Sequence, residues 1–471
     1  MKRLLIGGLL VAMTVPALGQ RPRVGPAAKP FVRIDTTVVV LQHVRVIDGR
    51  GNPAREDQTV VIRDGSIAAV GDAATIAVPS GAQVLDLTGK SVIPGLVMVH
   101  EHLFYPAGSG TYGNFTESFV KLYLAGGVTS MRTGGNMNGY AEINIAKAIA
   151  RGDKAGPWVD ATAPYLNGPN PFGQMQALNT PEEARRFVDF WADQGATSFK
   201  AYMQIRRDVL GAAIKEAHRR KLKVTGHLCS VTYAEAAGLG IDDLEHGFLA
   251  ATDFVPGKKP DECPGQGQGQ QTVGQLDPES SAFKALVAKL VRAKVALTST
   301  LTVFETFTPG RPMAPGTEVL APHLKEQYDK LYATVSTQTQ SQYTTLFPKA
   351  MALEYGFAKA GGLLIAGTDP TGGGGVVPGF SNQRQVELLA EAGFSPVEAI
   401  KIVTMNGATY LGRADRVGSI EVGKQADLVV IDGNPAATIA DIRKVELVFK
   451  QGVGYDPGKL IASVKGSVGY Y

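Results

Sequence analysis

Strand-like runs that alternate with helical patterns are the feature that most limits how this chain can fold. Eight short apolar runs end in polar residues, and most precede a segment with helical periodicity. This alternation is typical of parallel strands joined by helices. The runs are SVIPGLVMVH (91–100), GVTSMRT (127–133), WVDATAP (158–164), ATSFKAY (196–202), KVTGHL (223–228), DDLEHG (242–247), KVALTST (294–300) and LLIAGTD (363–369). Eight such units predict an α/β fold of the (β/α)8 TIM-barrel type.

The helical pattern is clearest in TPEEARRFVDFWADQG, which follows the third run. Thr180 stands where an N-cap is needed, Pro181 takes the first helical position, and Gly195 can end the helix. We therefore predict a helix from 181 to 194.

Both ends of the chain show a different pattern. Residues 36–90 and the stretch from GSIEVGKQADLVVIDGNP onward contain short alternating segments broken by Asp-Gly turns, which indicates hairpins. We predict a small β-sandwich domain built from both chain ends, 31–94 and 411–471, and a distorted barrel over 95–410. Two intervals, 248–284 and 301–360, exceed a simple connection, and loops of such length often cover an active site.

The first nineteen residues have the layout of a secretory signal. Lys2 and Arg3 precede an apolar run of about ten residues, and small residues surround Ala17 and Gly19. The run is too short to span a bilayer. We predict a signal peptide over 1–19 and an exported protein, periplasmic or secreted, with no membrane attachment after removal of the signal. A buried first helix is the alternative.

Charge and cysteine content limit the classes of binding partner and of fold that the sequence allows. The formal net charge is +4, and two units of it belong to Lys2 and Arg3. The sequence has no run of basic residues that would indicate nucleic-acid binding. A small-molecule substrate is the expected partner. The sequence leaves open whether the protein forms a homo-oligomer. Cys229 and Cys263 are the only cysteines, too few for a disulfide scaffold. A disulfide between them and two unrelated thiols both stay open.

The ends of the predicted strands carry a set of metal-ligand side chains. Four of the seven histidines fall there, and barrel active sites are built at that face. Nitrogen and oxygen ligands suit zinc or a similar divalent ion. The set consists of His100, His102, Lys200, His227, His246 and Asp369. The other three histidines are His43, His218 and His323, in a hairpin, a charged helix and an insert.

These ligands exceed the need of one tetrahedral ion, so two ions are expected. Two ions about 3.5–4 Å apart need a bridging anion. Lys200 can supply one only if its amine, kept neutral by burial, takes up carbon dioxide to become a carbamate. Cys229, two residues after His227, is a weaker candidate as a soft ligand.

PGLVMVHEH, SFKAY, TGHL, LEHG and AGTDP, in this order, resemble the amidohydrolase superfamily, in its two-metal branch with a carboxylated lysine. The likeness covers roughly 36–450 and extends to secreted imidazolonepropionase-like and prolidase-like amidohydrolases. It implies two divalent ions, with zinc expected. It assigns His100, His102 and Asp369 to one ion, His227 and His246 to the other, and Lys200 to the bridge.

The resemblance also implies a reaction. A metal-bridging hydroxide would attack a carbonyl, and Asp369 would act as general base and then acid towards the leaving amine. We expect cleavage of an amide C–N bond in a dipeptide, an N-acyl amino acid or a cyclic amide. Hydrolysis of a lactone, carbamate or organophosphate ester is the alternative on the same site. The third hypothesis is a binding protein that has this fold but no catalytic activity.

Two departures from the family leave the substrate open. Met98 stands where the family usually has an acidic residue, and APYLNG offers Tyr165 and Asn167 where a histidine is expected. A substrate near a chain end would present a carboxylate. We expect Arg132, Tyr165 and Tyr202, which stand at other strand ends, to contact it.

Overall fold

The computed structural model describes residues 21–108, 110–171, 173–265 and 267–469. The predicted signal peptide over 1–19 lies outside the described residues. One helical expectation is confirmed in detail: α3 spans Pro181–Gln194, and the Thr180 hydroxyl accepts a hydrogen bond from the Glu183 amide. Gly195 ends this helix with a left-handed backbone, φ +108°.

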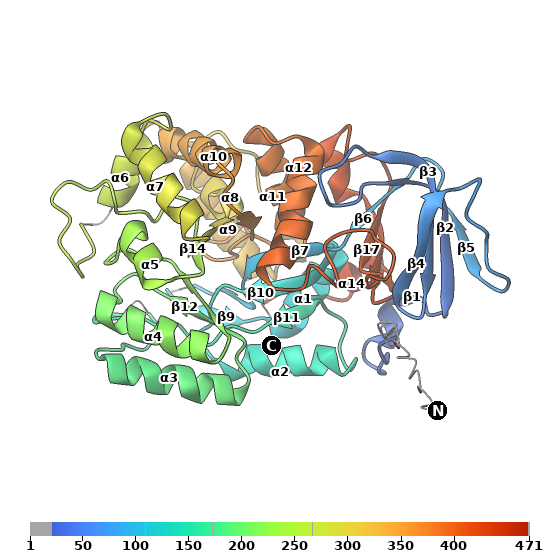
Figure 1. The fold of residues 1–471 in the computed structure, drawn as a ribbon, viewed down its shortest axis with the longest axis horizontal. Helices are drawn as coiled ribbons and strands as arrows, with labels where there is room; N and C mark the ends of the chain where they lie inside the picture. The colour runs from blue at the N-terminus through green and yellow to red at the C-terminus, as the bar shows by residue number, and fades with distance from the viewer. Residues whose placement is uncertain (1–20, 109, 172, 266, 470–471) are drawn as a thin grey trace, which may run out of the picture.

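Strands from both ends of the chain form one sheet of nine strands, which lies at one side of the molecule (Figure 1). Its order is β1-β19-β18-β17-β6-β2-β3-β4, and β5 pairs with β2. The strands are β1 (Val32–Ile34), β2 (Val38–Val46), β3 (Arg55–Arg63), β4 (Ser66–Asp72), β5 (Gln83–Asp86), β6 (Ser91–Pro94), β17 (Leu428–Ile431), β18 (Val445–Lys450) and β19 (Val453–Tyr455). A separate cluster of buried valine, leucine and isoleucine side chains packs this sheet.

All eight predicted strand runs contain a strand of a parallel sheet. One sheet has the order β11-β10-β7 and the other the order β12-β13-β14-β15-β16. The strands are β7 (Leu96–Glu101), β10 (Val128–Thr133), β11 (Trp158–Asp160), β12 (Ser198–Ala201), β13 (Lys223–Gly226), β14 (Asp243–Glu245), β15 (Ala296–Ser299) and β16 (Leu364–Ala366). A short hairpin of β8 (Phe104–Pro106) and β9 (Tyr112–Asn114) follows β7.

The two parallel sheets meet through isolated contacts and not through a continuous ladder. Single bridges join Thr162 to Ser198 and Leu166 to Ala201, just beyond β11. On the other side, the amides of Thr368 and Asp369 donate to the His100 carbonyl. The strand pairings thus show an α/β fold with parallel sheets, but they do not complete the ring that the sequence predicts.

The predicted first strand is two strands. β6 pairs with β17 in the nine-stranded sheet, whereas β7 pairs with β10 in a parallel sheet, and only Gly95 separates β6 from β7. A Cβ atom on Gly95 would overlap the Thr129 side chain, so no larger residue fits at this junction. The run 91–100 therefore joins the two parts of the molecule without a linker.

Helices surround the parallel strands (Figure 1). A large contiguous core of buried apolar side chains fills the space between them. The helices are α1 (Thr116–Ala125), α2 (Tyr140–Ala150), α3, α4 (Arg207–Arg219), α5 (Tyr233–Leu239), α6 (Gln268–Gln275), α7 (Ser281–Arg292), α8 (Leu301–Glu305), α9 (Pro322–Ser336), α10 (Tyr343–Lys359), α11 (Phe380–Glu391), α12 (Pro396–Lys401), α13 (Gly407–Tyr410) and α14 (Pro457–Ala462).

Both long intervals have structure of their own. The interval 301–360 contains α8, α9 and α10. The loop after β14 is tied to the end of β13 by a disulfide between Cys229 and Cys263. Of the two alternatives for these cysteines, the structure shows the pair, and it leaves Cys229 no free thiol with which to bind a metal.

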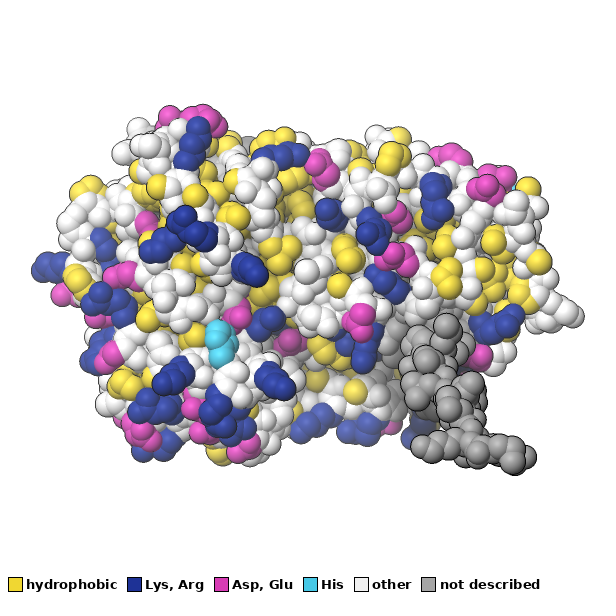
Figure 2. All heavy atoms as spheres, viewed as in Figure 1, with side chains coloured by type: hydrophobic (Ala, Val, Ile, Leu, Met, Phe, Trp, Pro, Cys, Tyr) yellow, Lys and Arg dark blue, Asp and Glu magenta, His cyan; other side chains and the backbone are white. Residues whose placement is uncertain are grey.

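The surface carries mixed charge. Basic and acidic side chains are interspersed on the face shown in Figure 2. Along the edge formed by α3 and α4, Arg219 and Arg220 pair with Asp189 at 3.1 and 2.6 Å. Among the described helices, none has the length and apolar character needed to cross a bilayer.

Candidate active site

All six side chains predicted to bind metal line one cavity of about 160 Å³. Each stands at or just after the carboxyl end of a parallel strand, where the chain leaves the sheet. Five of them are buried, Lys200 being 1% exposed, and His227 is partly buried. The six are His100 and His102 from β7, Lys200 from β12, His227 after β13, His246 after β14 and Asp369 after β16.

Three of them form the tightest group. The ligand atoms of His100, His102 and Asp369 all lie within 4.8 Å of one another. Oδ1 of Asp369 is 3.1 Å from Nε2 of His102 and 3.7 Å from Nε2 of His100. This buried group of two imidazoles and a carboxylate is consistent with metal binding of the kind found in amidohydrolases.

Lys200 and the other two histidines complete the ring of side chains. Nζ of Lys200 lies 3.3 Å from Nε2 of His100. The rings of His227 and His246 have their centroids 4.4 Å apart, and those of His100 and His246 are 4.7 Å apart. Oδ2 of Asp369 is 3.6 Å from Nδ1 of His246. Asp369 therefore stands between the two groups of histidines.

Hydrogen bonds behind the histidines fix their orientation. Nδ1 of His102 donates to the Gly135 carbonyl at 3.2 Å, and Nδ1 of His100 contacts the buried Glu245 carboxylate. In both rings this leaves the Nε2 lone pair for the cavity. Nδ1 of His246 contacts the Thr300 hydroxyl at 2.9 Å.

Sequence reasoning missed Glu245 and Thr300. Glu245 precedes His246 in LEHG, and a carboxylate inside an apolar strand is itself a signal of an internal partner. Thr300 ends the run KVALTST and carries no comparable signal. The partners of both come from distant parts of the chain: Glu245 and His100 are 145 positions apart.

Burial favours the neutral form of His102, His227 and His246, whereas the Glu245 and Asp369 carboxylates raise the pKa of His100 against the effect of its burial. Burial lowers the pKa of His227 to about 3 and the pKa of His102 to about 4, and the nearby Lys200 amine adds to the effect at His227. Burial also lowers the pKa of Lys200, against the opposing pull of the Glu245 carboxylate. Neutral imidazoles and an amine that loses its proton readily are the forms that bind metal and carbon dioxide.

Two site residues have an uncommon backbone. Asp369 has φ +54° and His246 has φ +67°, both in the left-handed region. Aspartate and histidine are tolerated there better than most residues, but such positions usually occur where the surrounding structure holds them. The chain thus turns sharply at both residues, which aims their side chains into the cavity.

The structure corrects the expectation for Arg132. This side chain is 1% exposed and does not line the cavity. Its guanidinium lies inside the parallel sheets, 3.2 Å from the Glu245 carboxylate, and donates to the hydroxyls of Ser198 and Thr225. Arg132 therefore neutralises Glu245 behind the site, and it is out of reach of a substrate in the cavity.

The predicted tyrosines do line the cavity. The rings of Tyr165 and Tyr202 are 5.0 Å apart, and Tyr112 of β9 joins them. Burial raises the pKa of all three phenols, that of Tyr112 to about 12, so they are hydrogen-bond donors at neutral pH. Asn167 instead binds the backbone, accepting from the Gln204 amide at 3.0 Å.

Apart from Thr371 and Gly372, the remaining walls are apolar. Lys200 is the one basic side chain that lines the cavity in the part of the chain that the structure describes. Sequence reasoning did not identify these walls, although HLFYP placed aromatic residues directly after the first two histidines. The apolar lining consists of Phe104, Met137, Met175, Val303, Phe304 and Phe307.

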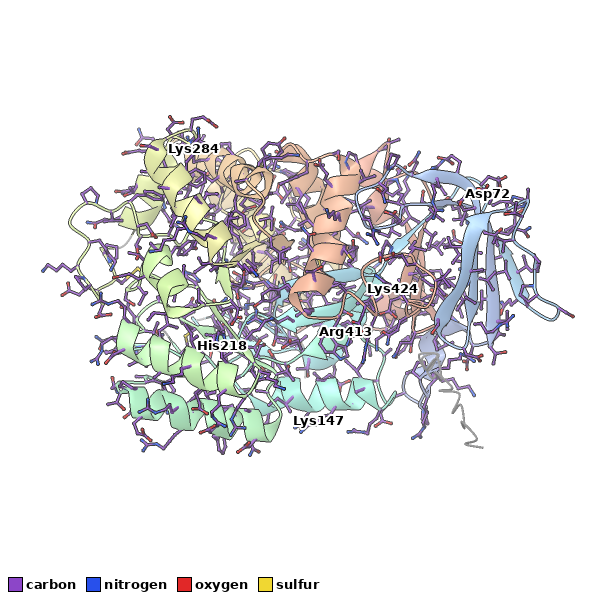
Figure 3. All side chains as sticks on the ribbon, in the orientation of Figure 1. Asp72, Lys147, His218, Lys284, Arg413 and Lys424 are labelled. Atoms are coloured by element: carbon purple, nitrogen blue, oxygen red, sulfur yellow. A yellow bond between two sulfur atoms is a disulfide. The ribbon has the colours of Figure 1, made fainter. Side chains whose placement is uncertain are left out.

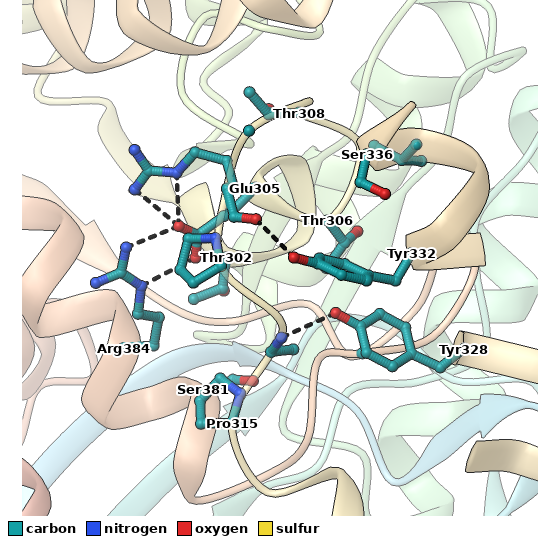
Figure 4. A pocket seen from close by; sticks show the side chains of 16 residues that line it. Thr302, Glu305, Thr306, Thr308, Pro315, Tyr328, Tyr332, Ser336, Ser381 and Arg384 are labelled. Carbon is teal, nitrogen blue, oxygen red and sulfur yellow. Dashed lines mark hydrogen bonds and ion pairs between the residues drawn. The ribbon is translucent and has the colours of Figure 1, made fainter. Parts of the chain in front are cut away.

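Ion pairs hold one of these walls in place. α8, which carries Val303 and Phe304, ends at Glu305. The Glu305 carboxylate accepts from Arg311 at 2.8 Å and from Arg384 at 2.7 Å (Figure 4). Both arginines are mostly shielded from solvent, so these contacts are screened less than surface pairs.

Comparison with known proteins agrees with this geometry. The Amidohydrolase family profile matches residues 338–454. An imidazolonepropionase from Porphyromonas gingivalis is 26% identical over 410 residues, which cover 83% of this chain and 86% of that protein. A putative prolidase from Bifidobacterium longum has a similar structure, with TM-score 0.68 and 24% identity over 92% of this chain and all of that chain. Phenylurea hydrolase B gives TM-score 0.67 at 20% identity, over 92% of this chain and all of that one.

The chain is similar to amidohydrolases over most of its length, and its strand-end motifs agree with this similarity. The similar structures are less than 25% identical, so they support the fold and do not define the substrate.

Proposed function

We propose that this protein is an exported metal-dependent hydrolase that cleaves an amide C–N bond beside an apolar or aromatic group. The observation that carries the proposal is one cavity in which all six candidate ligands meet aromatic walls. We further propose that the two parallel sheets act as one distorted barrel, because backbone contacts join them on both sides. The disulfide supports export, since such bonds persist in oxidising compartments.

The donor set fits two divalent ions, with zinc expected. His100 and His102 engage Nδ1 behind the site and turn Nε2 towards the cavity, which is the atom that zinc can bind. His100, His102 and Asp369 would hold one ion, and His227 and His246 the other. Lys200, as a carbamate, would bridge them. Bound divalent ions polarise a carbonyl and lower the pKa of water towards neutrality.

Side chains of the protein would carry out proton transfer and hold the substrate. Asp369 stands between His102 and His246, where its carboxylate can take a proton from the attacking water and pass it to the leaving nitrogen. Tyr165 and Tyr202 line the cavity, and burial keeps their phenols protonated at neutral pH. We propose that these phenols donate hydrogen bonds to polar atoms of the substrate near the scissile bond.

The walls favour an uncharged substrate. A carboxylate-bearing dipeptide needs a cation beyond the metal ligands, and Arg132 is engaged by Glu245. The aromatic side chains Phe104, Phe304 and Phe307 instead offer flat apolar contact. Aryl amides and aryl ureas are therefore preferred over dipeptides and N-acyl amino acids.

A hydrolysis panel with metal analysis tests the proposal. We expect about two zinc equivalents per chain, loss of activity with 1,10-phenanthroline, and a higher kcat/KM for acetanilide and phenylurea than for Gly-Pro or N-acetylglycine. γ-Lactones and aryl phosphotriesters in the panel test the ester alternative. Metal-replete protein that hydrolyses none of these substrates would contradict an amidohydrolase function and favour a binding protein on this fold.

A further inference from the structure

A second cavity, remote from the strand ends, lies between α2, β11 and the nine-stranded sheet. Its volume is about 320 Å³, within the range of pockets for small ligands. Apolar side chains from α2 and β11 form one wall, among them Ile149, Trp158 and Val159. None of the candidate metal ligands lines it. We refer to this space as the inter-sheet cavity.

The opposite side of the inter-sheet cavity is basic. Arg413 lies between the parallel sheets and the nine-stranded sheet, and Lys147 lies below it on α2 (Figure 3). Lys450, at the end of β18, also lines the cavity. Asp427 is the one carboxylate among the described lining residues, and it already accepts the Gln451 amide at 2.7 Å. The lining therefore has three basic groups against one occupied acid.

Among the described residues, neither Arg413 nor Lys450 forms an ion pair within 4.0 Å, although the Asp427 carboxylate attracts both electrostatically. Nε of Arg413 is buried and has no hydrogen-bond partner among the described residues. Its guanidinium lies 3.9 Å over the Trp158 ring, which orients it without neutralising it. In the same part of the chain, the Lys450 amine makes no hydrogen bond and no ion pair within 4.0 Å, and burial lowers its pKa to about 8. A buried donor without a partner is costly, so this arrangement favours an external acceptor.

We propose that the inter-sheet cavity binds a small organic carboxylate with an apolar body. The carboxylate lies between Arg413 and Lys450, and the body packs on Ile149 and Val159. Charge-assisted hydrogen bonds to the guanidinium give affinity for the anion, and the apolar wall selects an aliphatic or aromatic acid over an inorganic ion. This site is separate from the hydrolytic site and does not depend on its chemistry.

4-Bromobenzoate is a suitable probe, because bromine locates the molecule by anomalous scattering in crystals of the whole protein. Calorimetric titration gives the affinity, and 4-bromobenzamide is the uncharged analogue of the same shape. We expect bromine density in the inter-sheet cavity and at least tenfold weaker binding of the amide. Arg413→Gln and Lys450→Gln should each weaken carboxylate binding about tenfold while leaving amide binding unchanged.

Arg416→Gln is the matched control. Arg416 lies three residues away on the same segment, is exposed, and does not line the cavity. It should leave binding of the probe unchanged. Melting temperatures exclude unfolding as the cause of any loss, and Lys450→Gln breaks no hydrogen bond or close ion pair among the described residues. Equal affinity for acid and amide, bromine density only at the strand ends, or unchanged binding in both variants would overturn the proposal.

Discussion

The orientations of His100, His102 and His246 depend on contacts of Nδ1 with groups behind the cavity. Thr300 is the clearest case, because its hydroxyl contacts Nδ1 of His246 at 2.9 Å. Partners of this kind hold the ring and its tautomer, and their loss typically lowers metal affinity 10- to 100-fold.

Thr300→Val should therefore weaken one ion site without unfolding the protein. Valine keeps the shape and removes the hydroxyl, so the stability cost is about 1 kcal/mol. We expect metal content to fall from about two equivalents towards one under dilute zinc, with activity falling in parallel. The exposed Thr334→Val on α9 is the control. Two tightly held equivalents in Thr300→Val would show that the hydroxyl does not position His246.

Glu354 on α10 gives a prediction for pH. This side chain is 1% exposed, its Oε2 atom has no partner among the described residues, and burial raises its pKa from 4.5 to about 8. The folded protein keeps this proton between these two values while the unfolded chain releases it. The stability that the protonated group contributes is thus present at acid pH and is lost as pH rises from 4.5 to about 8.

Glu354→Gln should remove this dependence, because the amide is neutral throughout. We expect it to match the parent near pH 4 and to exceed the parent in free energy of unfolding by about 5 kcal/mol at pH 9. Urea unfolding at both pH values measures the difference, with the exposed Glu318→Gln as control. A variant that is less stable than the parent at pH 9 would contradict the prediction.

Single residues also mark the limit of sequence reasoning. His100 and His246 could be found because a histidine at the end of a strand stands out in a β/α pattern. Arg132 stands at such an end as well, yet its partner Glu245 lies 113 positions away. An arginine that binds substrate and one that neutralises a buried acid have the same local sequence. Only the three-dimensional structure separates the two roles.

At the scale of elements, the disulfide is the main constraint on the loop after β14. Cys229 follows His227 closely, so the bond ties this loop to a strand end that carries a candidate ligand. The two cysteines are 34 positions apart. Closing a loop of this length stabilises the folded state by about 3–4 kcal/mol in the chain-entropy account.

The Cys229→Ser, Cys263→Ser double variant should lose about this amount of stability. It should also become insensitive to reductant, because no bond remains to reduce. Denaturant unfolding with and without dithiothreitol measures both effects, and the reduced parent is the internal control. Equal stability of the oxidised parent and the double variant would show that the bond does not constrain the chain.

Elements could be predicted better than their connections. The period of the pattern revealed α3 and all eight parallel strands, because caps, glycines and apolar runs act locally. The division of 91–100 into β6 and β7 was missed, since both halves are apolar and only their partners differ. The aromatic walls on α8 and β8 also escaped, because long inserts give no periodic signal about where they fold.

At the scale of the whole molecule, the continuous run from β6 to β7 couples the nine-stranded sheet to the candidate ligands. β6 pairs with β17, and β7 carries His100 at its end. With one glycine between them, the two strands have little freedom to move separately. Unfolding of either part should therefore disrupt the other.

Calorimetry should accordingly show one unfolding transition for the whole chain, and zinc should move all of it upward. Binding to the folded state alone adds about 2.7 kcal/mol when free zinc is 100 times its Kd. A chelated sample should unfold earlier, still in one step. Two transitions, of which zinc moves only one, would show that the sheet and the metal site unfold independently.

The pairing of β6 with β17 also limits how this protein can be shortened. A gene fragment that encodes only 95–410 would lack both strands, and one that ends before 428 would keep β6 but lose its neighbour. The exposed edge left behind, rich in valine and isoleucine, offers unpaired backbone groups to other chains. Such fragments should aggregate during expression, so the part that carries the candidate ligands should not fold without the strands from both chain ends.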